Sequence, residues 1–119
     1  MKKDPDIFLR HILESIEWVE EYLKDVEERE FFASERAQQI QDSVIRRLEI
    51  IGEAVRNLPE DFRKEHREIP WDEIAGMRDI LIHEYFGVDV QLVWDTATSD
   101  LPKLKEQISL LLKNSTRSG

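Results

Sequence analysis

An arginine, an aspartate and a histidine stand close together in a mostly apolar stretch, residues 77–87. Charged groups in apolar surroundings cost free energy unless they are paired or used. In a helix, Asp79 and His83 are i, i+4 neighbours, so the carboxylate can hydrogen-bond the imidazole and orient it. Arg78 adds a permanent planar cation, and Tyr85, seven residues later, returns to nearly the same angle of the helix. The pattern favours acid–base chemistry beside a fixed cation; the alternative is a core-facing helix with a satisfied histidine.

The spacing Arg78-x4-His83-x-Tyr85 resembles the R-x(4–6)-H-x-Y signature of HepT-like proteins, small all-helical members of the HEPN superfamily. The similarity extends over nearly the whole chain, with matching segments at residues 50–54, 69–71, 84–88 and 100–102. Family members are typically ribonuclease toxins paired with a minimal nucleotidyltransferase antitoxin. The resemblance therefore implies the toxin of a type VII toxin–antitoxin pair. Its partners would be an RNA substrate such as tRNA or mRNA, the antitoxin, and a second copy of the chain.

A ribonuclease of this kind needs no metal and no cofactor, because RNA carries its own nucleophile, the ribose 2′-hydroxyl. The enzyme must move protons and stabilise the developing phosphorane charge. His83 fits the first role because imidazole titrates near neutrality, and Arg78 fits the second. Asp79 would fix the imidazole tautomer. The products would be a 2′,3′-cyclic phosphate and a 5′-hydroxyl.

His83 lies five positions after Arg78, which places the two about 140° apart in an ideal helix. Either the arginine curls round the helix, or each site combines groups from two subunits. We favour the second arrangement, because a dimer with facing motifs also supplies a second histidine as general acid.

Tyr85 is expected to be a control point. A phenol has an ordinary pKa near 10, too high for an efficient base at neutral pH. By resemblance, the antitoxin transfers AMP to this residue and so blocks the site. The alternative is a tyrosine that only packs the bundle.

Composition bounds the class of protein. A chain of 119 residues fits one domain, which we place at residues 1–113, followed by a frayed tail at 114–119. There is no cysteine, so disulfides and cysteine-based zinc sites are excluded, and the three histidines lack metal-ligand spacing. No signal-peptide core or membrane-length apolar run is present. We therefore expect a soluble cytoplasmic protein that does not contact membranes.

The formal charge of −9 is unfavourable for RNA binding, which relies on basic contacts to phosphate. Acidic residues dominate from Glu14 to Glu35. Basic residues accumulate later, at Arg46, Arg47, Arg56, Arg63, Lys64, Arg67 and Arg78. Among them we predict RNA contacts for Arg46 and Arg47, while solvated helix faces are the alternative. The acidic balance also suits the second hypothesis for function, a non-catalytic helical module that binds a nucleotide or a protein partner.

Apolar residues recur at three- and four-residue steps, and no segment alternates as a strand does. The first helix is predicted from Asp4 and Pro5 to about Val26, and a charged connection follows at residues 27–32. A second helix is predicted from an N-cap at Ser34, and the motif helix from Pro70. Asp89 should cap the next helix, which is expected to break or bend before Pro102. The fold class is therefore all-α, an up-and-down bundle of four to five helices like that of HEPN proteins.

Overall fold

The computed structural model describes the backbone of residues 4–83 and 89–118, and the side chains of residues 4–77 and 89–115. This part of the chain is helical and contains no strand, which confirms the all-α prediction. The α-helices are α1 (Pro5–Leu23), α2 (Glu28–Ala33), α3 (Ala37–Asn57), α4 (Glu60–Glu65), α5 (Trp71–His83), α6 (Val90–Asp95) and α7 (Leu101–Ser118). A π-helical turn, η1 (Thr96–Asp100), joins α6 to α7.

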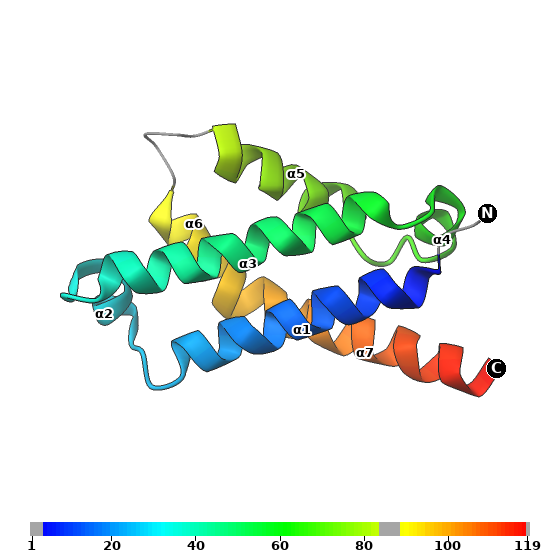
Figure 1. Ribbon diagram of the computed structural model, residues 1–119, viewed down its shortest axis with the longest axis horizontal. Coiled ribbons are helices and arrows are strands. Elements are labelled where there is room, and N and C mark those ends of the chain that lie inside the picture. The colour runs from blue at the N-terminus through cyan, green and yellow to red at the C-terminus, as the bar shows by residue number, and fades with distance from the viewer. Residues whose placement is uncertain (1–3, 84–88, 119) are drawn as a thin grey trace.

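The four longer helices, α1, α3, α5 and α7, run alternately in opposite directions (Figure 1). Helix α3 lies between α1 and α5 and packs against both, and α7 packs along α1. This is the predicted up-and-down bundle. The shorter helices α2, α4 and α6 lie in the connections between the longer ones.

Apolar residues from one stripe of each longer helix form the core. They include Leu9, Ile12, Ile16 and Val19 of α1, Val44, Leu48, Ile51 and Val55 of α3, and Leu104 and Ile108 of α7. Burying one such side chain contributes about 1.5–3 kcal/mol. At the surface, the Lys105 ammonium donates to the Glu20 carboxylate at 2.8 Å and links α7 to α1; this hydrogen bond raises the pKa of Lys105.

The start of α1 is as predicted and its end is earlier. The Asp4 carboxylate accepts a hydrogen bond from the Asp6 backbone N–H at 3.0 Å, and Pro5 is the first helical residue. The helix ends at Leu23, whereas the prediction continued to about Val26. Asp25 explains the difference, because its φ of 61° lies in the left-handed region, which cannot continue a right-handed helix.

The prediction of Ser34 as an N-cap is wrong. Ser34 follows the last residue of α2, and α3 begins only at Ala37. The segment expected to be a charged connection is helical because Phe31 anchors it in the core. The Phe31 ring is 0% exposed and its centroid lies 5.1 Å from that of Trp94, while Gln41 Nε2 donates to the Phe31 carbonyl at 2.8 Å.

A π turn interrupts the regular α-helix between α6 and α7, next to the break or bend predicted at Asp100-Leu101-Pro102, and the chain is helical throughout this segment. Asp89 caps α6 as predicted, accepting from the Leu92 backbone N–H at 3.1 Å. Pro102 has no N–H, and its ring would collide with the carbonyl four residues earlier in a regular helix. The wider π turn accommodates it, with the Leu101 N–H donating to the Thr96 carbonyl.

Helix α7 continues to Ser118, so its backbone is helical within the segment predicted to fray. The Ser115 hydroxyl donates to the Asp6 carboxylate at 2.7 Å and joins the end of α7 to the start of α1. The extent of the single domain, residues 1–113, stays a prediction.

Replacing Thr96 by valine is expected to stabilise the fold. The Thr96 hydroxyl in η1 is buried and has no hydrogen-bond partner in the described part of the structure. A buried hydroxyl without a partner costs about 1–3 kcal/mol, and valine keeps the branched shape without it. Urea denaturation should show that Thr96→Val raises the free energy of unfolding by about 1 kcal/mol.

Thr98→Val is the matched control, because the exposed Thr98 hydroxyl donates to the Trp94 carbonyl at 2.8 Å. This variant should change stability little or lower it slightly. A Thr96→Val variant less stable than the parent would contradict the explanation.

Candidate active site

Helix α5 carries the residues predicted to be catalytic. The helix was predicted to start at Pro70, and it starts at the next residue, Trp71. The Pro70 carbonyl accepts a hydrogen bond from the Ile74 N–H at 3.1 Å. The backbones of Arg78, Asp79 and His83 belong to this helix, with His83 its last residue. Their side chains lie outside the described part of the structure, as does the whole of Tyr85. The catalytic roles of Arg78, Asp79 and His83 and the modification of Tyr85 therefore stay predictions.

The helical register places positions 72, 76, 79 and 83 in one row along α5, each three or four residues from the next. We call this the 72–83 row. Trp71 and Ala75, on another side of the helix, are buried in the core. In the row itself, Asp72 is exposed, and a Cβ built on Gly76 would meet no atom of the described residues within 4 Å. At its two described positions, 72 and 76, the row thus lies at an open part of the surface of the single chain.

Arg46 and Arg47, the predicted RNA contacts, lie on α3 beside α1. The Arg46 side chain is 71% exposed, with its Nη1 3.6 Å from Glu49 Oε2. Arg47 stacks over the Trp18 ring, its guanidinium carbon 5.5 Å from the ring centroid. Both arginines thus have local partners, and their role in RNA binding stays a prediction.

Other basic residues gather where α5 begins. Arg63 and Lys64 of α4 and Arg67 of the following turn line an open depression of about 510 Å³ next to Trp71. We call it the α4–α5 hollow. Its acidic members are Glu60, Asp72 and Glu73. In the sequence, these basic residues belong to a cluster of acidic and basic residues. The turn between α4 and α5 places them around the same hollow.

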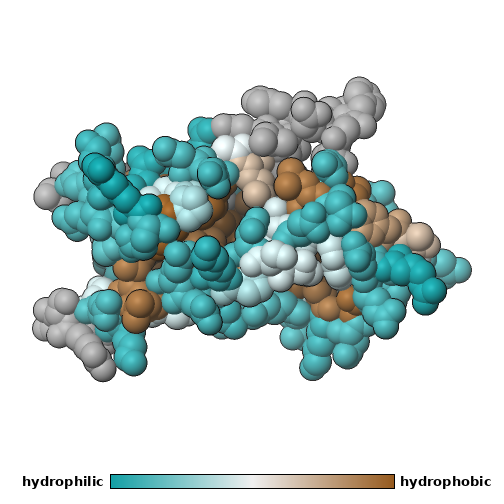
Figure 2. Space-filling view, turned by 180° about the vertical axis from the view of Figure 1, so that it is seen from behind, coloured by the Kyte–Doolittle hydropathy of each residue, from teal (hydrophilic) through white to brown (hydrophobic). Residues whose placement is uncertain are grey.

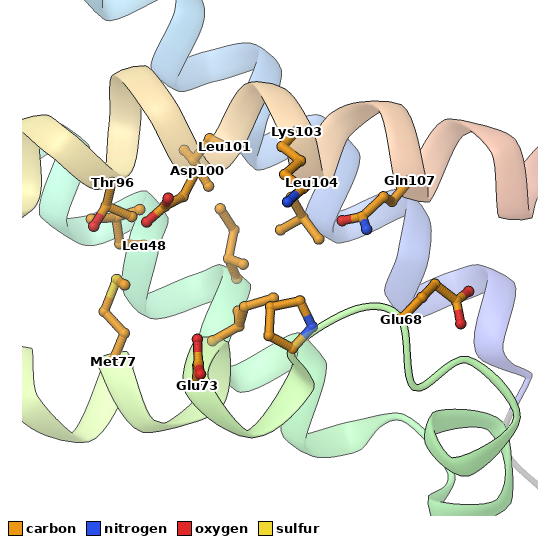
Figure 3. A pocket seen from close by; sticks show the side chains of 13 residues that line it. Leu48, Glu68, Glu73, Met77, Thr96, Asp100, Leu101, Lys103, Leu104 and Gln107 are labelled. Carbon is orange, nitrogen blue, oxygen red and sulfur yellow. The ribbon is translucent and has the colours of Figure 1, made fainter.

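A second pocket lies between α5 and the segment formed by η1 and α7, and has a volume of about 280 Å³ (Figure 3). Leu48, Ile51, Ile74, Met77, Leu101 and Leu104 supply most of its apolar lining. Its charged members are Glu68, Glu73 and Asp100 against Lys103. This balance is unfavourable for RNA phosphates, so we assign no RNA contact to this pocket.

The described residues hold no group of three or more histidine, aspartate or glutamate side chains arranged to bind a metal. Over the same part of the chain, none of the helices combines the length and the apolar character needed to cross a membrane. The face in Figure 2 is mostly hydrophilic, with separate apolar patches among the hydrophilic side chains.

An all-helical bundle whose third long helix carries an Arg-x4-His motif defines the class of HEPN-like proteins. Residues 12–111 match the family model described as ribonuclease HepT-like. The chain therefore belongs to the HepT-like ribonuclease family, and the predicted membership is confirmed.

Curated relatives agree with this assignment. A Thermococcus cleftensis protein named "Probable ribonuclease HepT" is 46% identical over 113 residues, which cover 95% of this chain and 100% of that protein. A putative RNase of Caldanaerobacter subterraneus is 43% identical over 111 residues, or 93% of this chain and 96% of the relative.

A longer relative from Methanocaldococcus jannaschii is named as a gamma-glutamylcyclotransferase and putative RNase. It is 56% identical over 113 residues, which cover 95% of this chain but only 50% of that protein. The chain thus spans about half the length of this relative. No solved structure matches the chain.

Proposed function

We propose that this chain is a metal-independent endoribonuclease that acts in the cytoplasm as the toxin of a type VII toxin–antitoxin pair. The observation that carries the proposal is the match to the ribonuclease family over residues 12–111, a range that contains the complete Arg78-x4-His83-x-Tyr85 motif. The relatives named as ribonucleases, which align over more than nine tenths of this chain, support an RNA substrate.

The proposed reaction is an attack of the ribose 2′-hydroxyl on the adjacent phosphorus. His83 takes the hydroxyl proton as the general base, and Arg78 stabilises the charge that develops on the phosphorane oxygens. A proton reaches the leaving 5′-oxygen from the second histidine of a dimer. Asp79, one turn before His83, orients the imidazole. The open surface at Gly76 supports access of a polymer to the 72–83 row.

We also propose that the active form is a homodimer in which each site combines Arg78 and His83 from different subunits. The separation of about 140° between the two positions within one helix supports this arrangement. The single chain also exposes large apolar side chains, among them Ile7 (52%) and Leu110 (58%), which are available for contacts between copies.

Control by a minimal nucleotidyltransferase antitoxin is the remaining part of the proposal. The antitoxin transfers AMP to the Tyr85 hydroxyl and releases pyrophosphate from ATP. The added phosphate repels substrate phosphate, and the nucleotide occludes the site.

Incubation of the purified chain with total RNA in EDTA tests the proposed function. We expect cleavage without added metal, giving fragments with 2′,3′-cyclic phosphate and 5′-hydroxyl ends, because the nucleophile belongs to the RNA. End-labelling identifies these ends: polynucleotide kinase should label the new 5′ ends without prior phosphatase treatment. Intact RNA would favour the non-catalytic module, and cleavage only after magnesium is restored would contradict the metal-independent mechanism.

A further inference from the structure

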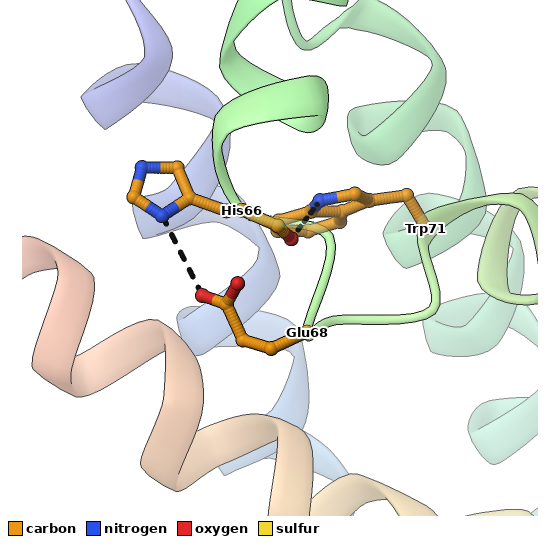
Figure 4. A network of polar contacts seen from close by, with 3 residues as sticks. All are labelled: His66, Glu68 and Trp71. Atoms are coloured by element: carbon orange, nitrogen blue, oxygen red, sulfur yellow. Dashed lines mark hydrogen bonds and ion pairs between the residues drawn. The ribbon is translucent and has the colours of Figure 1, made fainter.

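Several contacts hold the turn between α4 and α5, which borders the α4–α5 hollow (Figure 4). The Trp71 indole Nε1 donates to the His66 carbonyl at 2.9 Å, and the His66 ring lies 4.5 Å from that of Phe62. His66 Nδ1 is also 3.5 Å from Glu68 Oε1. The hydrogen bond from Trp71 to His66 thus ties the residue before Arg67 to the start of α5.

The acidic residues of the hollow leave two of its cations available. Lys64 Nζ is 3.3 Å from Glu60 Oε1, so this acidic residue already has a partner. Asp72 and Glu73 stand in the first turn of α5, where the positive end of the helix dipole attracts carboxylates. Within the described ranges, neither Arg63 nor Arg67 forms an ion pair, and the Arg63 Nε–H is buried without an acceptor.

Two guanidinium groups without carboxylate partners beside one open hollow suit a phosphate group. The planar arginine fork donates two parallel hydrogen bonds to phosphate oxygens, and a second arginine adds charge and fixes orientation. Arg67 is exposed and can reach a ligand from solvent, while Arg63 is partly buried in the wall of the hollow.

The position of the hollow relates it to the candidate catalytic row. Twelve residues of helix separate Trp71 from His83, a rise of about 18 Å. At about 3.4 Å for each phosphate, the spacing along one strand of a DNA duplex, about five nucleotides cover that distance. Among the described residues, none comes within 4 Å of a Cβ built on Gly76, midway along the row, so this part of the helix has no side chain of its own between it and a strand.

We propose that Arg63 and Arg67 form a phosphate-binding subsite that holds the RNA backbone several nucleotides from the scissile bond. This inference rests on the proposed nuclease function, since it adds a remote contact for the same substrate. RNA backbone and free phosphate share the chemistry that the subsite recognises, and the RNA backbone is the proposed occupant. The subsite makes binding depend on RNA length.

The test measures RNA binding in the His83→Ala background, which prevents cleavage during the titration. Fluorescence anisotropy gives the Kd of labelled RNAs of about four and about twelve nucleotides over a range of salt concentrations. Arg63→Gln together with Arg67→Gln should weaken binding of the longer RNA about tenfold and leave the shorter RNA unchanged. The slope of log K against log salt should fall by about 1.4, because two phosphate contacts to a single strand are lost.

Arg29→Gln is the matched control for Arg67→Gln, because Arg29 is an exposed arginine of α2 and its replacement removes the same single positive charge. It should leave the length dependence intact. If Arg63→Gln prevents folding, as judged by circular dichroism, exposed Arg67→Gln alone should still weaken binding of the longer RNA. Equal losses for both RNAs, or for Arg29→Gln and Arg67→Gln, would show a general charge effect and overturn the subsite.

Competition with inorganic phosphate tests whether the subsite binds the RNA backbone or only free phosphate. Inorganic phosphate should displace the longer RNA from the protein that keeps both Arg63 and Arg67, and not from the variant with both replaced. This result would support the subsite. Phosphate that binds through these arginines, while their replacement leaves RNA affinity unchanged, would overturn it. Cleavage with no dependence on RNA length would reject the subsite and keep the nuclease. Length-dependent binding without cleavage by the parental chain would reject the nuclease and keep the subsite.

Discussion

His83→Ala is expected to lower the rate of RNA cleavage about 10²–10⁴-fold, the usual loss when a positioned general base is removed. Arg78→Ala should cause a comparable loss, because the proposed mechanism assigns the stabilisation of the phosphorane charge to this guanidinium. Single-turnover cleavage of a labelled RNA at saturating enzyme measures the effect on the chemical step. Both variants should keep the helical circular dichroism and the thermal unfolding of the parent. Cleavage at the parental rate by both would reject the catalytic assignment, and loss of folding would favour structural roles.

Mixing the two inactive variants tests whether each site combines two subunits. A heterodimer of Arg78→Ala and His83→Ala subunits brings one intact arginine to one intact general-base histidine if the two come from different chains, but it lacks the second histidine, the proposed general acid. Statistical mixing makes half of the dimers heterodimers with one of two sites rebuilt in this way, so activity should rise above that of either variant alone and stay below roughly a quarter of the parental value. No rise above the separate variants would count against a site that combines the arginine and the general base of different chains. A light-scattering mass of a single chain at micromolar concentration would contradict the dimer itself.

Periodicity predicted the longer helices well because their apolar spacing coincides with burial. Leu9, Ile12, Ile16 and Val19 appear in the sequence at helical steps and are all buried in the core. Local capping chemistry likewise predicted the starts of α1 and α6, since the Asp4 and Asp89 side chains bond to backbone groups only two and three residues away.

Features that depend on distant contacts escaped prediction. Phe31 makes α2 helical by packing on Trp94, which lies 63 positions later in the chain and gives no local signal. The basic residues of the α4–α5 hollow were visible as a charge cluster, but their common orientation depends on the turn held by Trp71 and His66. For Arg46 and Arg47, the local charge predicted RNA contacts but gave no sign of their partners in the structure, Glu49 and Trp18.

Tyr85→Phe should separate catalysis from control. A phenyl ring keeps the bulk of tyrosine, and a phenol is too weakly acidic to serve as an efficient base at neutral pH. We therefore expect the variant to keep the fold and to cleave RNA within a few-fold of the parental rate. It lacks the hydroxyl oxygen that would attack the α-phosphate of ATP, so the antitoxin can attach no AMP at this position. Co-expression with the active antitoxin should rescue cells that carry the parental toxin and fail to rescue cells that carry Tyr85→Phe.

The other tyrosine provides the matched control. Tyr22, in α1, is partly buried beside Trp18, with ring centroids 5.9 Å apart. We therefore expect the antitoxin to neutralise the toxicity of Tyr22→Phe as it does that of the parent. Mass spectrometry of the co-expressed parental chain should find one or more adenylate groups on Tyr85, and an antitoxin without transferase activity should leave none. Adenylate only on other residues, or a Tyr85→Phe toxin that the antitoxin's catalysis still silences, would contradict the assignment. Loss of cleavage by Tyr85→Phe without antitoxin would instead place the hydroxyl in the catalytic machinery, because the charge and shape of the site are otherwise unchanged.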